Sequence, residues 1–446
     1  MSATAEPVAT GRLSRAIARP RALGYLCATI LVGATLEIVL AAANGKNALV
    51  PEQPKTAAWL KGFGPGLSYA VFLLTLIVFC IAYGVLVTLA LRMSQRRLSQ
   101  RGVIVVLVAL HAILFLGPVI ISTDLFSYLA YARMAALHGV NPYLHGPQSI
   151  AYDPIYPDVG IDWVHTTTAY GPLFTLISYP FGLLGVKAGI WGLKTVALLA
   201  SAGTLWLTWR CAKARGFEPA AAALIVGANP LYLLYGFGGA HNDLIMIFLM
   251  MGAIALVVSE PVRPRNEALA GAAIVAGAMI KATAGTLLPF MLVARRRATV
   301  LIGAAAVAIV VGLAGLAAFG THGIDVVSAL SRDSKFVSTD SFANEFAHII
   351  GKPGLYPVDH DILKAGLAVV LLYLLWRTWR GYDWIAASGW ALLAIVVTTT
   401  WLLAWYIVWP LPLAVISRDR RLLAATLFVM GCFLVHQYSP LLEPVK

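Results

Sequence analysis

Apolar runs about as long as a lipid bilayer is thick recur along the whole sequence. A helix needs about 20 predominantly apolar residues to cross the hydrocarbon core of a membrane. The candidates for such spans are 23–43, 67–91, 102–122, 188–209, 219–236, 241–259, 299–319, 362–376, 384–403 and 422–436. Residues 267–295, with Lys281, and residues 404–416, with Pro410 and Pro412, are predicted to form short or broken helices. Such helices are tolerated where they line a protein cavity.

The composition excludes a soluble globular chain. Hydrophobic residues make up 60% and charged residues 12% of the 446 residues, whereas a soluble domain carries about 25% charged residues. The net charge of +13 comes from short basic clusters between apolar runs, which is the positive-inside pattern of membrane proteins, so no nucleic-acid partner is expected. The four cysteines lie far apart without the spacing of a zinc site. No metal and no cofactor are predicted.

The basic clusters also predict an orientation. They are Arg12/Arg15/Arg19/Arg21, Arg92/Arg96/Arg97/Arg101, Arg210/Lys213/Arg215, Arg263/Arg265, Arg295/Arg296/Arg297, Arg377/Arg380 and Arg418/Arg420/Arg421. One alternation places all of them inside, with the N-terminus inside, the C-terminus outside and about 13 membrane segments. This alternation requires that residues 171–186 do not cross the membrane. The predicted fold is an all-α polytopic transmembrane helical bundle with two long outer loops.

A single transmembrane domain, 1–446, is expected. Its predicted parts are a cytoplasmic arm (1–22), the first three spans (23–122), a first long outer loop with juxtamembrane helices (122–187), central spans (188–319), a second outer loop (320–361) and C-terminal spans (362–446). Half of the 20 acidic residues fall in the two outer loops. The run 23–43 is longer than the apolar core of a signal peptide, so an uncleaved first span is favoured, with cleavage as the alternative.

The start of the first outer loop is the first candidate for chemistry. If a helix runs from Asp124 to His138, then Asp124, Ser127/Tyr128, Tyr131, Ala135 and His138 follow helical spacing on one mostly polar face. Such an amphipathic helix can lie in the membrane interface and hold a carboxylate where a base could deprotonate an acceptor that attacks a lipid phosphate ester. The alternative is that Ser122, Thr123 or Asp124 simply caps the helix.

The second candidate is the run His241-Asn242-Asp243, which follows a glycine-rich turn between two spans. Ionisable groups inside a membrane domain indicate function by default, although Asn242 or Asp243 could cap the next helix. Lys281 is the third candidate, because a buried ammonium needs an anion and a lipid phosphate would serve. Its alternative is snorkelling to the interface.

Aromatic residues gather near an outer membrane boundary. Trp401, Trp405, Tyr406 and Trp409 fit an aromatic belt. The alternative is that they line the opening through which an isoprenoid chain passes.

A combination of motifs extends these candidates over most of the chain. They are Asp124–Tyr128, His138–Tyr143, Tyr170–Leu173, Gly239–Asp243, Lys281 and Trp405–Tyr406. In this order they resemble the integral membrane GT-C glycosyltransferases that use polyprenyl-phosphate sugars. The closest subset is that of the actinobacterial polyprenol-phosphomannose-dependent mannosyltransferases, which are similar to glycosyltransferase family 87.

The resemblance implies a multi-pass enzyme of the plasma (inner) membrane whose active site faces the periplasm or cell exterior. Asp124 would be the general base, with His241 as a second catalytic residue. The implied substrate-binding residues are Tyr128, Tyr131, Arg133, Tyr170, Asn242, Asp243, Lys281, Trp405 and Tyr406. The partners would be a polyprenyl-phosphate sugar donor, a glycolipid or polysaccharide acceptor and membrane lipids, with transfer of a hexose, mannose favoured, by an inverting displacement.

Two other classes stay open on the residues alone. A secondary transporter or flippase for a lipid-linked or anionic substrate would favour short loops, internal repeats and charges at the bilayer midplane. A non-catalytic lipid-binding scaffold would leave His241 and Lys281 without a purpose. On the transferase hypothesis, Asp124 and His241 should lie within the reach of one bound sugar phosphate.

Overall fold

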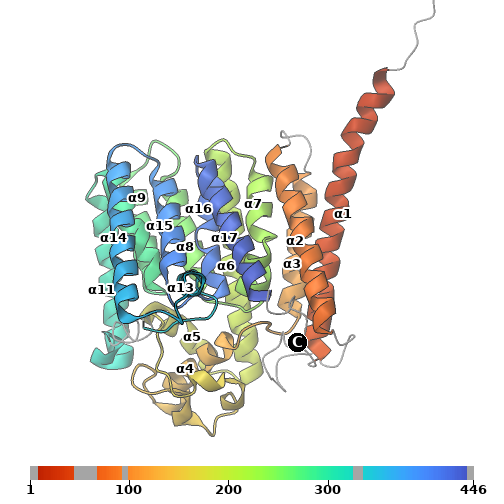
Figure 1. Cartoon of the computed structure of the whole chain (residues 1–446). Coiled ribbons are helices and arrows are strands. Elements are labelled where there is room, and N and C mark those ends of the chain that lie inside the picture. Colours follow the sequence, from red (N-terminus) through yellow and green to blue (C-terminus); the bar gives the residue numbers. More distant parts are fainter. Residues whose placement is uncertain (1–8, 45–67, 93–98, 325–334, 439–446) are drawn as a thin grey trace, which may run out of the picture.

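The computed structural model describes residues 9–44, 68–92, 99–324 and 335–438, and in these residues every regular element is a helix (Figure 1). The all-α prediction is therefore confirmed for the described part of the chain. The predicted cytoplasmic arm, 1–22, and the second outer loop, 320–361, lie partly outside it.

Five of the described helices are long and apolar enough to cross a membrane, or six if one bent pair counts as a single span. Shorter apolar helices stand among them in the bundle. The count of about 13 membrane segments and the orientation with the N-terminus inside stay predictions.

Three N-terminal helices pack on one side of the bundle (Figure 1). They are α1 (Ala9–Asn44), α2 (Tyr69–Arg92) and α3 (Gln100–Leu116). The Tyr83 hydroxyl of α2 donates a hydrogen bond to the Ile225 carbonyl at 2.7 Å, which ties these helices to the centre. α3 ends at Leu116, six residues before the predicted end of this span at 122, because Gly117 is followed by Pro118, which has no N–H to continue the helix.

The first predicted outer loop folds into a layer at one end of the bundle (Figure 1). It contains α4 (Asp124–His138), three 3-10 turns, η1 (Pro147–Ile150), η2 (Tyr156–Asp158) and η3 (Ile161–Trp163), and α5 (Pro172–Gly182). With 11 residues, α5 is too short to cross a bilayer, as predicted for this segment. α4 is different from the expected interfacial helix: all residues from Leu125 to Met134 are buried, because α5 and α6 cover it.

The centre contains two broken spans. The elements are α6 (Val186–Ala214), α7 (Pro219–Gly227), the π-helix η4 (Leu231–Phe237), α8 (Asp243–Val257), α9 (Pro264–Ala278), the 3-10 helix η5 (Ala282–Thr286), α10 (Leu287–Arg295) and α11 (Thr299–Phe319). α7 and η4 are bent by 53° where Pro230 interrupts them. Lys281 lies in extended backbone between α9 and η5, so the predicted break at this lysine is confirmed.

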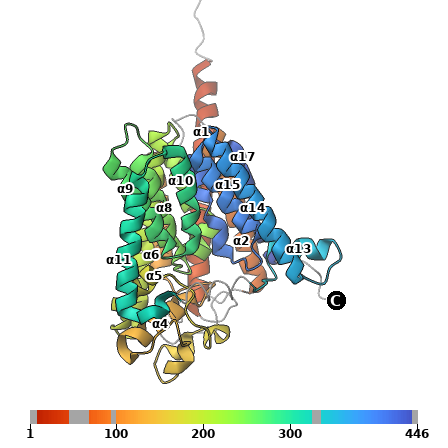
Figure 2. The ribbon, with the colours of Figure 1, turned by 90° about the vertical axis from the view of Figure 1, so that its left-hand side faces the viewer.

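The C-terminal part returns through the bundle and adds a second layer at the α4 end. It contains η6 (Gly320–Ile324), α13 (Phe342–Ile349), α14 (Pro357–Trp379), α15 (Trp384–Thr398), η7 (Ala404–Val408), α16 (Leu411–Ile416) and α17 (Arg420–Tyr438). In the turned view, α13 projects sideways from the bundle beyond the end of α14 (Figure 2). α15 ends five residues before the predicted 403, and residues 399–403 are extended.

The end of the bundle opposite α4, called here the far end, is held by ion pairs between loops. Arg215 pairs with Asp383, Arg295 pairs with Glu260 and Glu267, and Arg296 donates to the Trp379 carbonyl at 3.3 Å. The basic clusters of these loops, which the charge pattern assigns to one side of the membrane, therefore lie together at one end of the molecule.

Candidate active site

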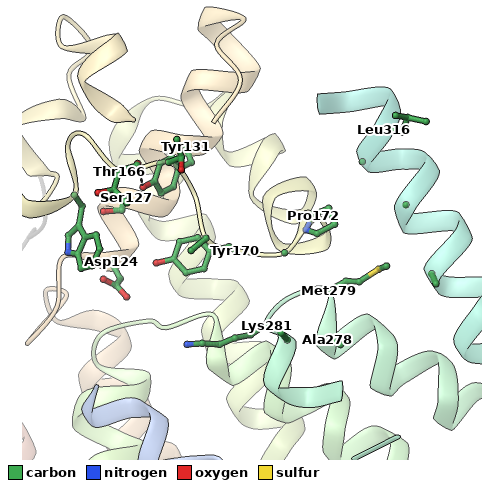
Figure 3. A pocket seen from close by; sticks show the side chains of 18 of the residues that line it. Asp124, Ser127, Tyr131, Thr166, Tyr170, Pro172, Ala278, Met279, Lys281 and Leu316 are labelled. Carbon is green, nitrogen blue, oxygen red and sulfur yellow. Dashed lines mark hydrogen bonds between the residues drawn. The ribbon is translucent and has the colours of Figure 1, made fainter. Parts of the chain in front are cut away.

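A cavity of about 740 Å³ lies at the α4 end, where α4, α5, η5, α11 and the extended segment 399–403 meet. Figure 3 shows its two unlike sides: Asp124, Ser127, Tyr131 and Thr166 face Tyr170 from one side, while Pro172, Ala278, Met279 and Leu316 line the other. The cavity therefore joins a polar wall to an apolar wall.

Asp124 is the first residue of α4, and its carboxylate reaches the cavity with its side chain 16% exposed. Its Oδ2 atom lies 3.3 Å from His241 Nδ1 and 3.4 Å from the Tyr128 hydroxyl. The helix is not capped by this side chain: Thr123 occupies the N-cap position, and Ser122 Oγ accepts a hydrogen bond from the Asp124 N–H at 3.1 Å. The capping alternative therefore does not explain the carboxylate.

His241 is fully buried behind Asp124 and does not line the cavity. Its ring stacks on Trp405 with 3.6 Å between centroids and 18° between planes. Within the described part of the chain, His241 Nε2 and Asn242 Nδ2 have no hydrogen-bond partner. The glycine turn makes room for the ring, because a Cβ at Gly239 would lie 2.6 Å from His241 Nε2. One face of Asp124 is thus backed by a rigid aromatic pair.

Tyr128 and Tyr170 stay protonated beside the Asp124 carboxylate. The Tyr128 hydroxyl lies 3.4 Å from His241 Nδ1 and 3.4 Å from Asn242 Oδ1, and its ring meets Tyr170 edge-on at 4.8 Å. Burial raises the pKa of Tyr128 and of Tyr170 well above the ordinary value, and the Asp124 carboxylate raises both further. Both hydroxyls therefore act as donors toward Asp124 or a bound molecule.

Lys281 enters the cavity wall from the break between α9 and η5. Its ammonium donates to both oxygens of Asp243 at 2.9 and 3.1 Å and lies 3.9 Å from the centroid of the Tyr406 ring. Trp409 Nε1 donates to the same carboxylate at 2.6 Å. Asp243 is 1% exposed and Lys281 16%, so the lysine is held in place from behind and keeps a face toward the cavity. Neither snorkelling nor capping by Asp243 fits these contacts.

Two main-chain hydrogen bonds, called here the Gly171 seam, join the Asp124 side of the cavity to the Lys281 side. The Gly171 N–H donates to the Ile280 carbonyl and the Leu173 N–H to the Met279 carbonyl, both at 3.1 Å. A Cβ at Gly171 would lie 2.1 Å from the Met279 oxygen, so only glycine permits this close approach. The seam fixes the first outer segment against the break at Lys281.

The predicted site residues divide into three groups. Those that line the cavity are Asp124, Tyr131, Tyr170, Lys281 and Tyr406. Those that stand behind them are Tyr128, His241, Asn242, Asp243 and Trp405. Arg133 is brought to neither group: it forms a bidentate pair with Asp153 at 2.8 and 2.9 Å and donates to the Leu184 carbonyl.

Trp405 and Trp409 are 8% and 3% exposed, so the aromatic-belt interpretation is wrong for them. Trp163, which the sequence analysis did not select, also lines the cavity. So do Ser127 and Trp401, which the sequence analysis placed on the polar face and in the aromatic group but not among the catalytic or substrate-binding residues. Ser127 could have been found from its place on the Asp124 face. In the described residues, no group of three or more His, Cys, Asp or Glu side chains is arranged to hold a metal ion.

Comparison with known proteins gives a consistent result. The family model described as "Alpha-(1->6)-mannopyranosyltransferase, N-terminal domain" matches residues 21–297, and "Glycosyltransferase family 87" matches residues 168–440. Each match covers more than half of the chain. The cavity that contains Asp124 is thus the candidate active site of a glycosyltransferase.

Named relatives agree with the family models. An alpha-(1->6)-mannopyranosyltransferase A of Mycobacterium tuberculosis is 31% identical over an alignment of 402 positions, which covers 82% of this chain and 75% of the relative. A protein of the same name from Corynebacterium glutamicum is 32% identical over 183 residues, 40% of this chain and 36% of the relative. The chain belongs to glycosyltransferase family 87, and its N-terminal part also matches the alpha-(1->6)-mannopyranosyltransferase family.

Proposed function

We propose that this protein transfers mannose from a polyprenyl-phosphate donor to a glycan acceptor on the outer face of the plasma membrane. The observation that carries the proposal is a carboxylate, Asp124, at the polar wall of a cavity whose opposite wall is apolar. Such a cavity suits a substrate with one hydrophilic and one lipid part. The relative whose match covers 82% of the chain is named as a mannosyltransferase, which favours mannose. The relatives give no support to the transporter alternative.

Asp124 is the proposed general base. It takes the proton of an acceptor hydroxyl while the hydroxyl oxygen attacks the anomeric carbon of the donor sugar. The bond from that carbon to the phosphate oxygen breaks, and its electron pair leaves with the polyprenyl phosphate. A single displacement of this kind inverts the anomeric configuration. His241 acts as a positioning residue, since the 3.3 Å contact with Asp124 fits donation from Nδ1 to the carboxylate.

Lys281 is the proposed partner of the donor phosphate. The leaving phosphate gains negative charge, and a pre-positioned ammonium stabilises that charge in a site shielded from water. Asp243 and Trp409 hold Lys281 in place, while Met279 and α11 offer an apolar surface to the lipid. We propose that the α4 end faces the outer side of the membrane, because the basic loops gather at the far end. Neither a nucleotide nor a metal is required by this scheme.

The test is mannose transfer by the purified protein in lipid nanodiscs. Polyprenyl-phosphate mannose is compared with GDP-mannose as donor, with an α-(1→6)-linked mannotetraose as acceptor and EDTA present in half of the reactions. Transfer only from the polyprenyl donor, unaffected by EDTA, supports the proposal. Transfer from GDP-mannose would refute the lipid-linked donor. No transfer from polyprenyl-phosphate mannose, glucose or arabinose to any glycan would favour the transporter alternative.

A further inference from the structure

Two tryptophans from distant parts of the chain meet at the polar side of the cavity. Trp163 comes from η3 in the first outer segment, and Trp401 from the extended segment after α15. Both line the cavity that contains Asp124, and their ring centroids are 6.2 Å apart with planes at 74°. The Phe336 ring also contacts Trp401, with 5.4 Å between the ring centroids. The rings form an angled aromatic wall.

The segment around Trp401 is held by hydrogen bonds to Ser338. The Ser338 N–H donates to the Thr400 carbonyl, the Leu402 N–H donates to Ser338 Oγ, and Ser338 Oγ donates to the Leu402 carbonyl, all at 2.9 Å. Tryptophans of an aromatic belt are exposed on the outside of a bundle, as Trp376 of α14 is with 51% exposure. Trp401 instead lines the cavity, so its position does not fit an aromatic belt.

Trp163 is fixed against the turn that precedes Asp124. The backbone N–H of Trp163 donates to the Gly160 carbonyl at 2.8 Å. A Cβ at Gly160 would lie 2.7 Å from Thr123 Oγ1 and 3.1 Å from Trp163 Cδ1, so this loop packs tightly beside the start of α4. The aromatic wall and the Asp124 carboxylate are therefore parts of one local structure.

A buried polar atom at the same place has no partner in the described part of the chain. Ser127 is 3% exposed, its Oγ makes no hydrogen bond there, and it lines the cavity beside Asp124. A buried hydroxyl without a partner costs free energy and indicates a ligand that supplies one. The neighbouring lining residues Trp163, Thr166 and Trp401 carry no charge, so this part of the wall fits a neutral molecule that has hydroxyl groups.

We infer that Trp163, Trp401 and Ser127 form the acceptor subsite, and that its ligand is an oligosaccharide of contiguous pyranose rings. Sugar rings have faces rich in C–H groups that pack on aromatic rings, while their edges carry hydroxyls for hydrogen bonds. One sugar would stack on Trp401 or Trp163 while Ser127 binds a hydroxyl close to Asp124. The inference rests on the proposed function only for the choice of mannose. The lipid part of the donor occupies the opposite, apolar wall.

The experiment measures both binding and transfer with the full chain in nanodiscs. The dissociation constant of an α-(1→6)-linked mannotetraose is measured by calorimetry, and the KM values of acceptor and donor are measured separately. The variants are Trp163→Ala, Trp401→Ala, Trp401→Phe and Ser127→Ala, with Trp376→Ala as the matched control. Loss of one stacking ring is expected to weaken the mannotetraose by about tenfold, in both binding and acceptor KM, with the donor KM unchanged. Trp401→Phe should retain most of the affinity.

The outcomes separate this inference from the proposed function. Weaker mannotetraose binding in Trp163→Ala and Trp401→Ala, beside an unchanged Trp376→Ala, supports the subsite even if the wild type transfers no mannose. Equal binding in all variants, or no binding by the wild type at millimolar mannotetraose, overturns it even if transfer to a lipid acceptor is found. Trp401→Phe keeps the test decisive if the alanine variant does not fold.

Discussion

The two ends of the bundle use the same kinds of charged residue in opposite ways. At the far end, buried Glu267 is closed on all sides: Arg295 contacts one oxygen at 3.1 Å and Thr299 donates to the other at 2.7 Å. At the α4 end, Asp124 contacts a histidine and a tyrosine and opens into a cavity. A closed network holds loops together, whereas a carboxylate that faces a cavity can contact a bound molecule.

The largest effects that test this comparison are expected when each of the two carboxylates is neutralised in a separate variant. Asp124→Asn should lower mannose transfer by about 10²–10⁴-fold, the usual effect of removing a general base, with little change in melting temperature. Glu267→Gln should do the reverse, because it weakens the buried pair with Arg295. Transfer rate and thermal unfolding are measured in parallel. If Asp124→Asn unfolds the protein as readily as Glu267→Gln, the two ends do not differ in kind.

The Lys281–Asp243 pair sharpens the comparison, because it is both structural and open to the cavity. Lys281→Met should lower transfer by about 10- to 100-fold, the worth of hydrogen bonds to a charged group, and also destabilise the protein by leaving Asp243 buried without a cation. The double variant Lys281→Met with Asp243→Asn should regain stability and not transfer. Recovery of transfer in the double variant would remove Lys281 from the reaction.

A smaller effect is expected at Tyr128, which stands behind Asp124. Tyr128→Phe removes a hydroxyl whose contacts with Asp124, His241 and Asn242 are all long, at 3.4 Å. A loss of about 1 kcal/mol is expected, so transfer should fall by about fivefold. The matched control is Tyr232→Phe, a buried tyrosine whose hydroxyl contacts Ser201 away from the cavity. Steady-state rates at saturating donor compare the two. An equal loss in both would mean that Tyr128 acts through packing alone.

The smallest effect concerns Asp153, a closed carboxylate at the α4 end. Burial opposes its charge, but hydrogen bonds from Arg133, the Ile155 N–H and His138 hold its pKa below the ordinary value. A lowered folded-state pKa adds stability above the unfolded pKa of about 3.9, and this stability is lost as the pH falls through the folded value.

Protease resistance of residues 139–170 between pH 7 and pH 3 measures this effect. Wild type should become more easily cut only at the acid end, whereas Asp153→Asn should be cut more easily at pH 7 and respond less to acid. Asp162→Asn, at an exposed position, is the control. A wild-type profile identical to that of Asp153→Asn would contradict the role of the ion pair.

Much of the site could be predicted because it depends on local patterns. Asp124 directly follows an apolar run, His241 opens another and Lys281 interrupts a third, and the structure brings all three elements together. The partner of Arg133 could not be predicted, since the contact with Asp153 depends on how the loop folds back on α4. The same holds for Trp401: its position depends on the bond between its neighbour Leu402 and Ser338, two residues that are 64 apart along the chain. Helix ends were missed where glycine and proline, as at residues 117–118, stop a helix inside an apolar run.

The Gly171 seam has a consequence for which donors fit. Two main-chain hydrogen bonds set the spacing between Asp124 and Lys281, and backbone adjusts less readily than a side chain. We therefore expect the site to select donors by the length of the phosphate link between sugar and lipid. If the donor phosphate lies at Lys281 as proposed, a lipid monophosphate would place the anomeric carbon close to Asp124. With a diphosphate, the extra phosphate would shift the sugar along the cavity, so we expect lipid diphosphate sugars to bind without reacting.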